Sequence, residues 1–175
     1  MSRAFFDTNV VVCAAYRTPD LRHETALLLL ERHLVEGSVV VSTQVLQETY
    51  SVLTRKKRLS GPAVLAYVTH LASQAVVPSS ASFVLRALAL AQRHQLSAWD
   101  ALMVQAALES NCAVLYTEDL QAGMRFGELE VVNPFKLQAH EPAPARPLKA
   151  PAPPARRAAS AAAGASRPAP RRPRK

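Results

Sequence analysis

Cysteine is scarce in this sequence, and histidine shows no metal-binding pattern. The two cysteines among 175 residues, Cys13 and Cys112, lie far apart and form no Cys-x-x-Cys pair. They therefore support neither a disulfide framework nor a zinc site. The five histidines show no His-x-x-x-His or Cys/His spacing, so we interpret them as surface or core residues rather than metal ligands.

Long hydrophobic runs are absent as well. The four leucines at 27–30 are flanked by charged residues and are far too short a run to span a bilayer. The apolar run at 4–6 stops at Asp7, so no signal peptide is evident. These absences predict a soluble, cytoplasmic protein with no membrane partner.

Charge is distributed very unevenly along the chain. The net charge is +8, yet residues 136–175 contain ten Lys or Arg and one acid, so the first 135 residues carry about −1. Hydrophobic residues make up 49% of the chain, enough for one sizeable core. We predict a globular domain over 1–135 and a disordered Ala/Pro/Arg-rich basic tail over 136–175. The tail is either a solvated extension or a non-specific electrostatic arm for RNA or DNA.

Short apolar runs alternate with helical patterns through the first 135 residues. Strands are expected over 4–6, 39–41, 75–77, 112–117 and 130–132, and helices over 21–35, 43–57, 62–74, 81–93 and 98–109. Strands separated by helices pair in parallel through right-handed crossovers. The sequence therefore predicts an α/β fold, a three-layer α/β/α sandwich with a central, mainly parallel sheet.

Four acidic residues are predicted to gather at one edge of this sheet. Asp7 follows the first strand and Asp119 follows the fourth, so both carboxylates lie at the carboxyl ends of parallel strands. Glu48 lies about two turns into the helix after the second strand, and Asp100 lies in the first turn after Ser97. Clustered carboxylates repel one another unless a cation is present. Oxygen ligands of this kind suit Mg²⁺ or Mn²⁺.

Each acid also has a purely structural explanation. Asp7 could form an Asx-turn, and Asp119 could cap a helix before the sequence LQAG. Asp100 could form a capping box with Ser97, and Glu48 could be a solvated residue on a helix face. Taken one at a time, Glu48 favours the structural explanation, and the other three acids leave both explanations open.

Three segments together resemble a known family. FFDTNVVV, VLQETYSVL and SAWDALMVQAALESNCAVLYTEDL occur in this order. They resemble the PIN-domain family, and more closely the small ribonuclease toxins of VapBC-type toxin–antitoxin pairs, over roughly residues 3 to 135. The resemblance implies a PIN-like fold and an acidic site whose positions fall on Asp7, Glu48, Asp100 and Asp119. Asn9 and Thr117 match supporting positions, and whether Glu118 or Asp119 faces the metal stays open.

The resemblance also implies a reaction. RNA phosphodiester bonds would be hydrolysed with one or two Mg²⁺ or Mn²⁺ ions, with Asp7, Asp100 and Asp119 as the expected metal ligands. Glu48 would bind a metal or position the attacking water. A haloacid-dehalogenase type of hydrolase would need a second Asp where this chain has Asn9.

RNA contacts must come from outside the acids, because carboxylates repel phosphate. The basic run Arg55, Lys56, Lys57 and Arg58 is the candidate for contacting the RNA backbone. The alternative is that these cations complement the dipole at a helix carboxyl terminus. For Trp99, core packing is favoured over stacking on a base.

Partners follow from the resemblance. Toxins of this kind are inhibited by a small antitoxin protein and commonly form homodimers. The function is therefore predicted to be that of a toxin ribonuclease, although PIN nucleases also process RNA. The alternative from a different class is a metal-free PIN-like scaffold that only binds RNA or a protein partner; loss of one or more acids would favour it, and all four are present.

Overall fold

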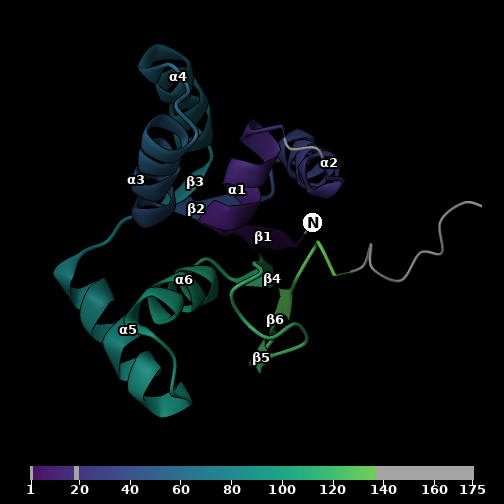
Figure 1. Cartoon of the computed structure of the whole chain (residues 1–175). Coiled ribbons are helices and arrows are strands. Elements are labelled where there is room, and N and C mark those ends of the chain that lie inside the picture. The colour runs from purple at the N-terminus through teal and green to yellow at the C-terminus, as the bar shows by residue number, and fades with distance from the viewer. Residues whose placement is uncertain (1, 18–19, 137–175) are drawn as a thin grey trace, which may run out of the picture. The chain divides into compact units, whose positions relative to one another are not determined.

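The computed structural model describes residues 2–17 and 20–136, and these form an α/β domain (Figure 1). Its sheet has six strands and is mostly parallel, and six α-helices accompany it in the described part, which confirms the predicted fold class. The strands are β1 (Arg3–Phe6), β2 (Val39–Ser42), β3 (Ala75–Val77), β4 (Cys112–Tyr116), β5 (Arg125–Phe126) and β6 (Leu129–Val132). The helices are α1 (Thr8–Ala15), α2 (Arg22–Val35), α3 (Thr43–Ser51), α4 (Gly61–Ala72), α5 (Ala81–His94) and α6 (Ala98–Glu109).

The sheet is built outward from β1. The strand order is β3-β2-β1-β4-β6-β5, and every pairing is parallel except that of β5 with β6. Phe5 and Phe6 on β1 and all four residues of β2 are buried. Strands covered on both faces need such continuous apolar runs, which is why 4–6 and 39–41 lack alternation.

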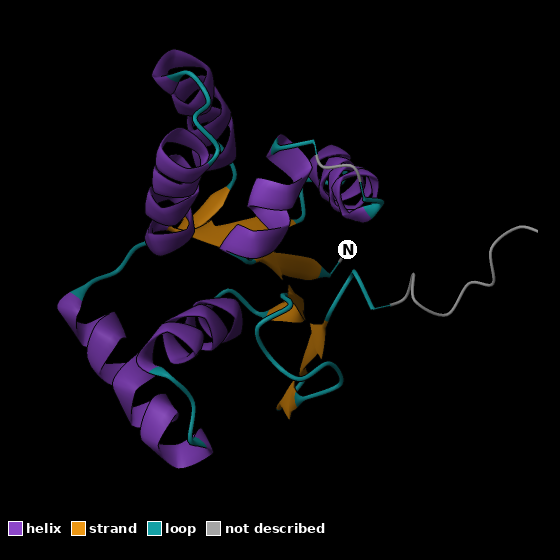
Figure 2. Ribbon diagram, viewed as in Figure 1, coloured by secondary structure: helices purple, strands orange, loops and turns teal. Residues whose placement is uncertain are grey.

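Helices cover the sheet in two layers (Figure 2). α2 and α3 contact β2, α1 lies against α2, and these helices lie on one face of the sheet. α6 contacts β1, β2 and β4 on the other face and carries α5 on its outer side. The chain moves from β1 to β3 in one direction and then returns to place β4 beside β1. A crevice for ligands is expected at such a reversal, outside the carboxyl ends of β1 and β4.

The helix α1 is absent from the sequence-based prediction, which assigned no element to residues 8–15. Its valine-rich sequence has a low intrinsic helix propensity, because β-branched side chains lose rotamer freedom in a helix. Asp7 caps the amino terminus, and Val10 and Val11 are fully buried. Capping and tertiary packing therefore override local propensity here.

Two further details differ from the prediction. The single helix expected over 43–57 is divided into α3 and a π-helical segment, η1 (Val52–Lys56), which is followed by Arg58 at a φ of +55°. β5 was not predicted, because a two-residue strand leaves no period to detect. The predicted tail over 136–175 lies outside the described residues except for Lys136.

The described residues contain no helix that is both long enough and apolar enough to cross a membrane.

A partly buried hydroxyl joins α4 to α1. The Tyr67 hydroxyl donates a hydrogen bond of 3.0 Å to the Val11 carbonyl oxygen of α1. Tyr67→Phe should lower the free energy of unfolding by about 1 kcal/mol, because that carbonyl loses its side-chain donor. Tyr50→Phe is the matched control, since Tyr50 is 42% exposed. Urea denaturation measures both, and equal stabilities would contradict the assigned role of the bond.

Candidate active site

Asp7 lies at the carboxyl end of β1, where the parallel register with β4 holds it in place. Phe6 is paired with Tyr116, so Asp7 and Thr117 follow side by side. The Thr117 hydroxyl donates to Asp7 Oδ2 at 2.6 Å, and the Thr8 backbone N–H donates to Asp7 Oδ1 at 2.6 Å. Asp7 is only 8% exposed and also caps α1.

Asn9 connects Asp7 to the loop after β4. Its side-chain amide donates to Asp7 Oδ2 at 2.7 Å and to Asp119 Oδ2 at 3.1 Å, and it lies 3.3 Å from the Thr117 hydroxyl oxygen. The Asp119 backbone N–H donates to that same Thr117 oxygen at 3.1 Å. Asn9 and Thr117 thus hold two acids at adjacent strand ends. Asp119 caps no helix, because residues 118–123 form bends and turns.

Glu48 reaches the same edge of the sheet from α3. The Thr8 hydroxyl donates to Glu48 Oε2 at 2.8 Å, and the Gln44 side-chain amide donates to Glu48 Oε1 at 2.9 Å. The helix α3 begins directly at the end of β2 with Ser42 as its cap. Glu48 is therefore hydrogen-bonded to the residue that follows Asp7, rather than being only solvated.

Asp100 lies in the first turn of α6. Its backbone N–H donates to the Ser97 side-chain oxygen at 3.1 Å, and the Ser97 hydroxyl donates to Asp100 Oδ2 at 2.7 Å. Ser97 thus caps α6 as the sequence suggested, although Asp100 bonds the Ser97 hydroxyl rather than the Ser97 backbone N–H of a full capping box. The other carboxylate oxygen is not used in it, so capping and a role in the site coexist.

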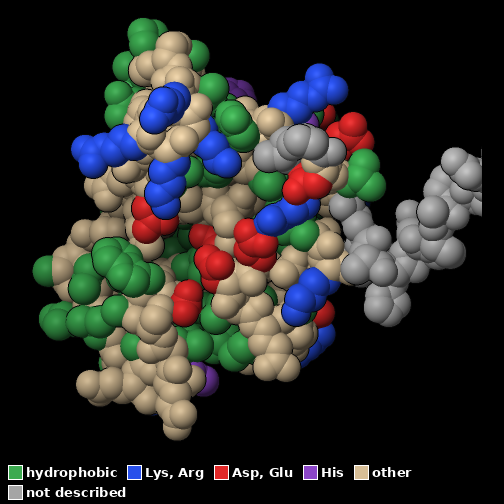
Figure 3. Space-filling view, viewed as in Figure 1, with side chains coloured by type: hydrophobic (Ala, Val, Ile, Leu, Met, Phe, Trp, Pro, Cys, Tyr) green, Lys and Arg blue, Asp and Glu red, His purple; other side chains and the backbone are tan. Residues whose placement is uncertain are grey.

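The four acids line one pocket, which we call the acidic pocket. Its volume is about 70 Å³, and the side chains around it come from the residue after β1, the end of β2, the helices α3 and α6, and the loop after β4: Asp7, Ser42, Gln44, Val45, Glu48, Trp99, Asp100, Met103 and Asp119. Acidic side chains surround a hollow in the middle of the face shown in Figure 3. The structure thus brings all four proposed site acids together.

Burial shapes the electrostatics of the acidic pocket. It raises the pKa of Asp7 from 3.8 to about 6, because the charged form loses solvation. The hydrogen bonds from Thr117 and Thr8 lower the pKa and offset part of this effect. The charges of Asp119 and Glu48 raise it further. A cation in the pocket would therefore stabilise the charged form of Asp7.

The donor set fits a hard divalent cation, since it offers carboxylate oxygens without His or Cys. Within the described residues, no group of three or more His, Cys, Asp or Glu side chains is arranged to hold an ion. The Asn9 amide and the Thr8 hydroxyl engage oxygens of Asp7, Asp119 and Glu48. In the structure described, these oxygens thus accept hydrogen bonds from neutral donors.

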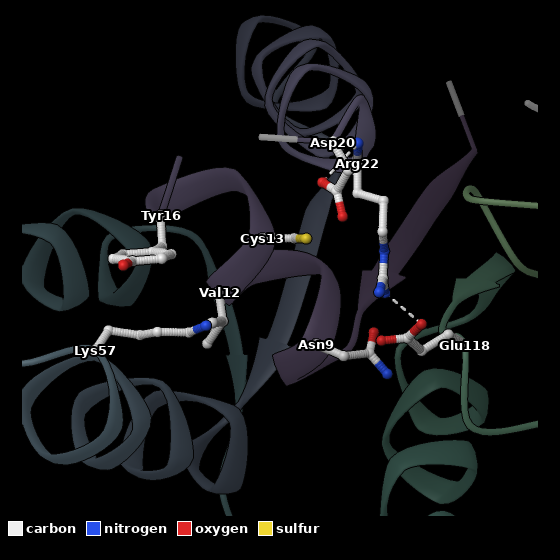
Figure 4. Close-up of a pocket in the computed structure, with 8 residues that line it drawn as sticks. All are labelled: Asn9, Val12, Cys13, Tyr16, Asp20, Arg22, Lys57 and Glu118. Carbon is white, nitrogen blue, oxygen red and sulfur yellow. Dashed lines mark hydrogen bonds and ion pairs between the residues drawn. The ribbon is translucent and has the colours of Figure 1, made fainter. Parts of the chain in front are cut away.

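Glu118 points away from the acidic pocket. It forms an ion pair with Arg22 and lines a neighbouring cavity of about 240 Å³, which we call the Arg22 cavity (Figure 4). Of the two adjacent acids, Asp119 lines the acidic pocket and Glu118 does not. The structure therefore places Asp119, and not Glu118, beside Asp7, Glu48 and Asp100.

The basic run after α3 is divided between two environments. Arg55, Lys56 and Arg58 are exposed. Lys57 is half-buried, lines the Arg22 cavity and places its ammonium 4.5 Å from the centroid of the Tyr16 ring. Only Lys57 of the four therefore has a fixed position beside the site.

Sequence reasoning missed three residues of the site. Thr8 and Gln44 hold Glu48, and their positions one residue after Asp7 and one helical turn before Glu48 were the available signals. Trp99 was expected in the core, which is wrong: it is 66% exposed and lines the acidic pocket. The helix α6 buries Ala101 and Val104, so position 99 falls on its outer side.

The chain matches one protein-family model and is similar in structure to several solved proteins. A family model described as PIN domain matches residues 4–123. No curated protein matches the sequence significantly. Three solved structures similar to this chain come from bacterial toxin–antitoxin systems.

The first is Mycobacterium tuberculosis VapC20, titled a Sarcin-Ricin loop cleaving toxin, with 22% identity, a TM-score of 0.51, and coverage of 66% of this chain and 89% of that one. A toxin–antitoxin complex from Klebsiella pneumoniae has 19% identity and a TM-score of 0.54 over 75% of this chain and 97% of that one. VapBC2 from Rickettsia felis, bound to a promoter DNA fragment, has 19% identity and a TM-score of 0.50 over 73% and 96%. At these identities the likeness establishes the fold.

The raised pKa of Asp7 predicts how stability depends on pH when metal is chelated. The unfolded chain loses this proton near pH 3.8 and the folded chain near 6, so the penalty of the buried charge develops between these values and is fully present above them. Asp7→Asn lacks this penalty. Relative to wild type, the free energy of unfolding of the variant should rise by on the order of 2 kcal/mol between pH 4 and pH 7.5. Urea denaturation in EDTA measures the difference, and a difference that does not change with pH would contradict the prediction.

Proposed function

This chain belongs to the PIN-domain family, and on that premise we propose that it is a Mg²⁺- or Mn²⁺-dependent endoribonuclease that hydrolyses RNA phosphodiester bonds. PIN domains are typically nucleases. The observation that carries the proposal is the acidic pocket, in which Asp7, Glu48, Asp100 and Asp119 gather at the crevice between β1 and β4. Few other roles explain why a fold would hold four carboxylates so close together.

The acidic and polar residues of the pocket would have different roles in the reaction. Asp7, Asp100 and Asp119 would hold the metal. Glu48 would either bind the metal as well or position the attacking water. When bound, the cation would offset the repulsion among the acids and stabilise negative charge on the reacting phosphate. Asn9 and Thr117 are positioning residues, because they fix the oxygens of Asp7 and Asp119 by hydrogen bonds.

RNA must approach this pocket from a basic surface. Arg55, Lys56 and Arg58 are exposed cations at the end of η1, and Lys57 lines the cavity beside Asn9. Contacts of this kind to the RNA backbone add affinity without reading sequence. Arg55 and Lys56 also lie in the last turn of η1, where their charges complement the helix dipole.

We further propose that the protein is the toxin of a toxin–antitoxin pair, with a small antitoxin protein as partner and a homodimer as its assembly. The support is the likeness of its fold to toxin structures, two of which were solved as toxin–antitoxin assemblies. A second support is α2, which leaves Leu28 and Val35 exposed in a leucine-rich helix. Apolar helix faces of this kind are suited to pairing with a partner helix.

The nuclease proposal predicts metal-dependent cleavage by the purified protein. Wild type should cleave labelled RNA with Mg²⁺ or Mn²⁺ and not with EDTA. Asp7→Asn, Asp100→Asn and Glu48→Gln should each lower the rate at least about 100-fold, because each removes a charge from the pocket while nearly preserving shape. Glu31→Gln is the matched control for Glu48→Gln, since Glu31 is exposed on α2, outside the pocket.

Circular dichroism checks that the variants fold. If wild type cleaves none of several RNAs, or if the acid variants cleave as fast as wild type, the nuclease proposal fails. RNA binding without cleavage would then favour the metal-free scaffold.

A further inference from the structure

The Arg22 cavity lies directly beside the acidic pocket, and Asn9 separates the two. Asn9 lines the cavity, while its amide donates to Asp7 and Asp119 of the acidic pocket. Consecutive residues Glu118 and Asp119 likewise face the cavity and the pocket, respectively. A ligand that spans both spaces would therefore pass over Asn9.

The two spaces differ in size. The acidic pocket, at about 70 Å³, has room for a phosphate group or ions but not for a nucleotide base as well. The Arg22 cavity, at about 240 Å³, is more than three times larger and approaches the lower end of small-molecule pockets. The room that a nucleotide beside the reacting phosphate needs thus lies in the Arg22 cavity.

Two of the residues that line the cavity, Asn9 and Arg22, each have a buried side-chain atom without a hydrogen-bond partner among the described residues. These atoms are Asn9 Oδ1 and Arg22 Nε. The Arg22 guanidinium is held in place, because it pairs with Glu118 and lies 4.4 Å from the centroid of the Phe135 ring. Figure 4 shows Arg22 extending from α2 toward Glu118 and Asn9. One such donor and one such acceptor suit the edge of a base, which offers both, once a bound ligand makes these atoms accessible.

A positively charged side chain, Lys57, lines another side of the same cavity. Lys57 reaches in from the end of η1 with its ammonium near the Tyr16 ring. It takes part in none of the ion pairs found between described residues. Its ammonium can contact a phosphate in a cavity that the acids Asp20 and Glu118 also line.

We propose that the Arg22 cavity binds one nucleotide of single-stranded RNA next to the reacting phosphate, with Asn9 and Arg22 contacting the base and Lys57 contacting a phosphate. The inference rests on the proposed function, which supplies RNA as the ligand. The Arg22 cavity would thus contact a base. The acidic pocket alone would contact only the phosphate and would act on any phosphodiester. Unstacked bases read by side-chain donors and acceptors are the usual basis of sequence recognition in RNA.

Binding of RNA under non-cleaving conditions tests the cavity. The probe is a fluorescein-labelled single-stranded RNA of about 12 nucleotides with randomised sequence, measured by anisotropy in EDTA. Lys57→Met should raise Kd about fivefold and reduce the slope of log Kd against log salt by about 0.7, the value for one phosphate on a single strand. Lys136→Met is the matched control, because it removes the same charge from an exposed lysine outside the cavity and should change neither quantity.

Sequencing of the bound RNA tests the base contact. Arg22→Met should flatten the base preference at one position, whereas Arg32→Met, an exposed arginine on α2, should leave it unchanged. Thermal melting confirms that each variant folds. If wild type binds and cleaves RNA but Lys57→Met binds like Lys136→Met, the cavity proposal is overturned while the nuclease stands. Wild type that neither binds nor cleaves RNA overturns both.

A separate observation concerns Trp99, the only tryptophan in the chain. It is 66% exposed although it lines the acidic pocket, next to Asp100. An exposed indole is costly to leave in water, and its flat face offers stacking to any base. We infer that Trp99 stacks on a second base of the bound RNA at the rim of the acidic pocket.

The single indole makes this inference directly measurable. Adding unlabelled RNA in EDTA should quench the tryptophan fluorescence of wild type, and Trp99→Leu should raise Kd at least about fivefold, as loss of one stacked base requires. Trp99→Phe should restore most of the affinity. Tyr50→Leu, which removes a partly exposed aromatic outside both spaces, is the control and should bind normally. Equal affinity of Trp99→Leu and wild type, or RNA binding without quenching, would refute the stacking role.

Discussion

The hydrogen bond from the Thr117 hydroxyl to Asp7 joins residues 110 positions apart and ties the candidate site to the core. It forms because β1 and β4 pair in parallel with Phe6 opposite Tyr116. Any slip in this register would turn side chains to the opposite face of the sheet and separate the acids. The chemistry of the edge thus depends on pairing between buried strands, and the buried phenylalanines of β1 are as necessary to the site as its carboxylates.

In this arrangement the four acids of the pocket lie close together, and their like charges repel one another. Each acid of the pocket receives at least one hydrogen bond from a neutral donor: Thr8, Asn9, Gln44, Ser97 or Thr117. Neutral donors stabilise carboxylates without neutralising them, so the pocket keeps its attraction for cations. A lysine or arginine in their place would hold the acids more firmly and would compete with a metal ion.

Much of the fold and the positions of the acids could be predicted from the sequence. Asp7 and Asp119 each follow a buried apolar run, and parallel strands bring such positions to one edge. The rest depends on contacts between distant segments. Residues 8–15 form a helix because the core covers Val10 and Val11, and no local pattern shows that. The directions of Glu118 and Trp99 are set by Arg22 and by the orientation of α6, which periodicity alone does not give.

The two edge strands of the sheet, β3 and β5, limit how copies of the domain can associate. β3 has three residues and is followed by Pro78, and β5 has two residues with an Arg125–Glu130 ion pair beside it. Short edges bearing charge or proline offer little backbone for another strand to pair with. Sheet extension between molecules is therefore disfavoured, which protects the fold from edge-to-edge aggregation. Association between copies would then use surfaces other than the sheet edges, and the sheet that positions the acids would stay unchanged by it.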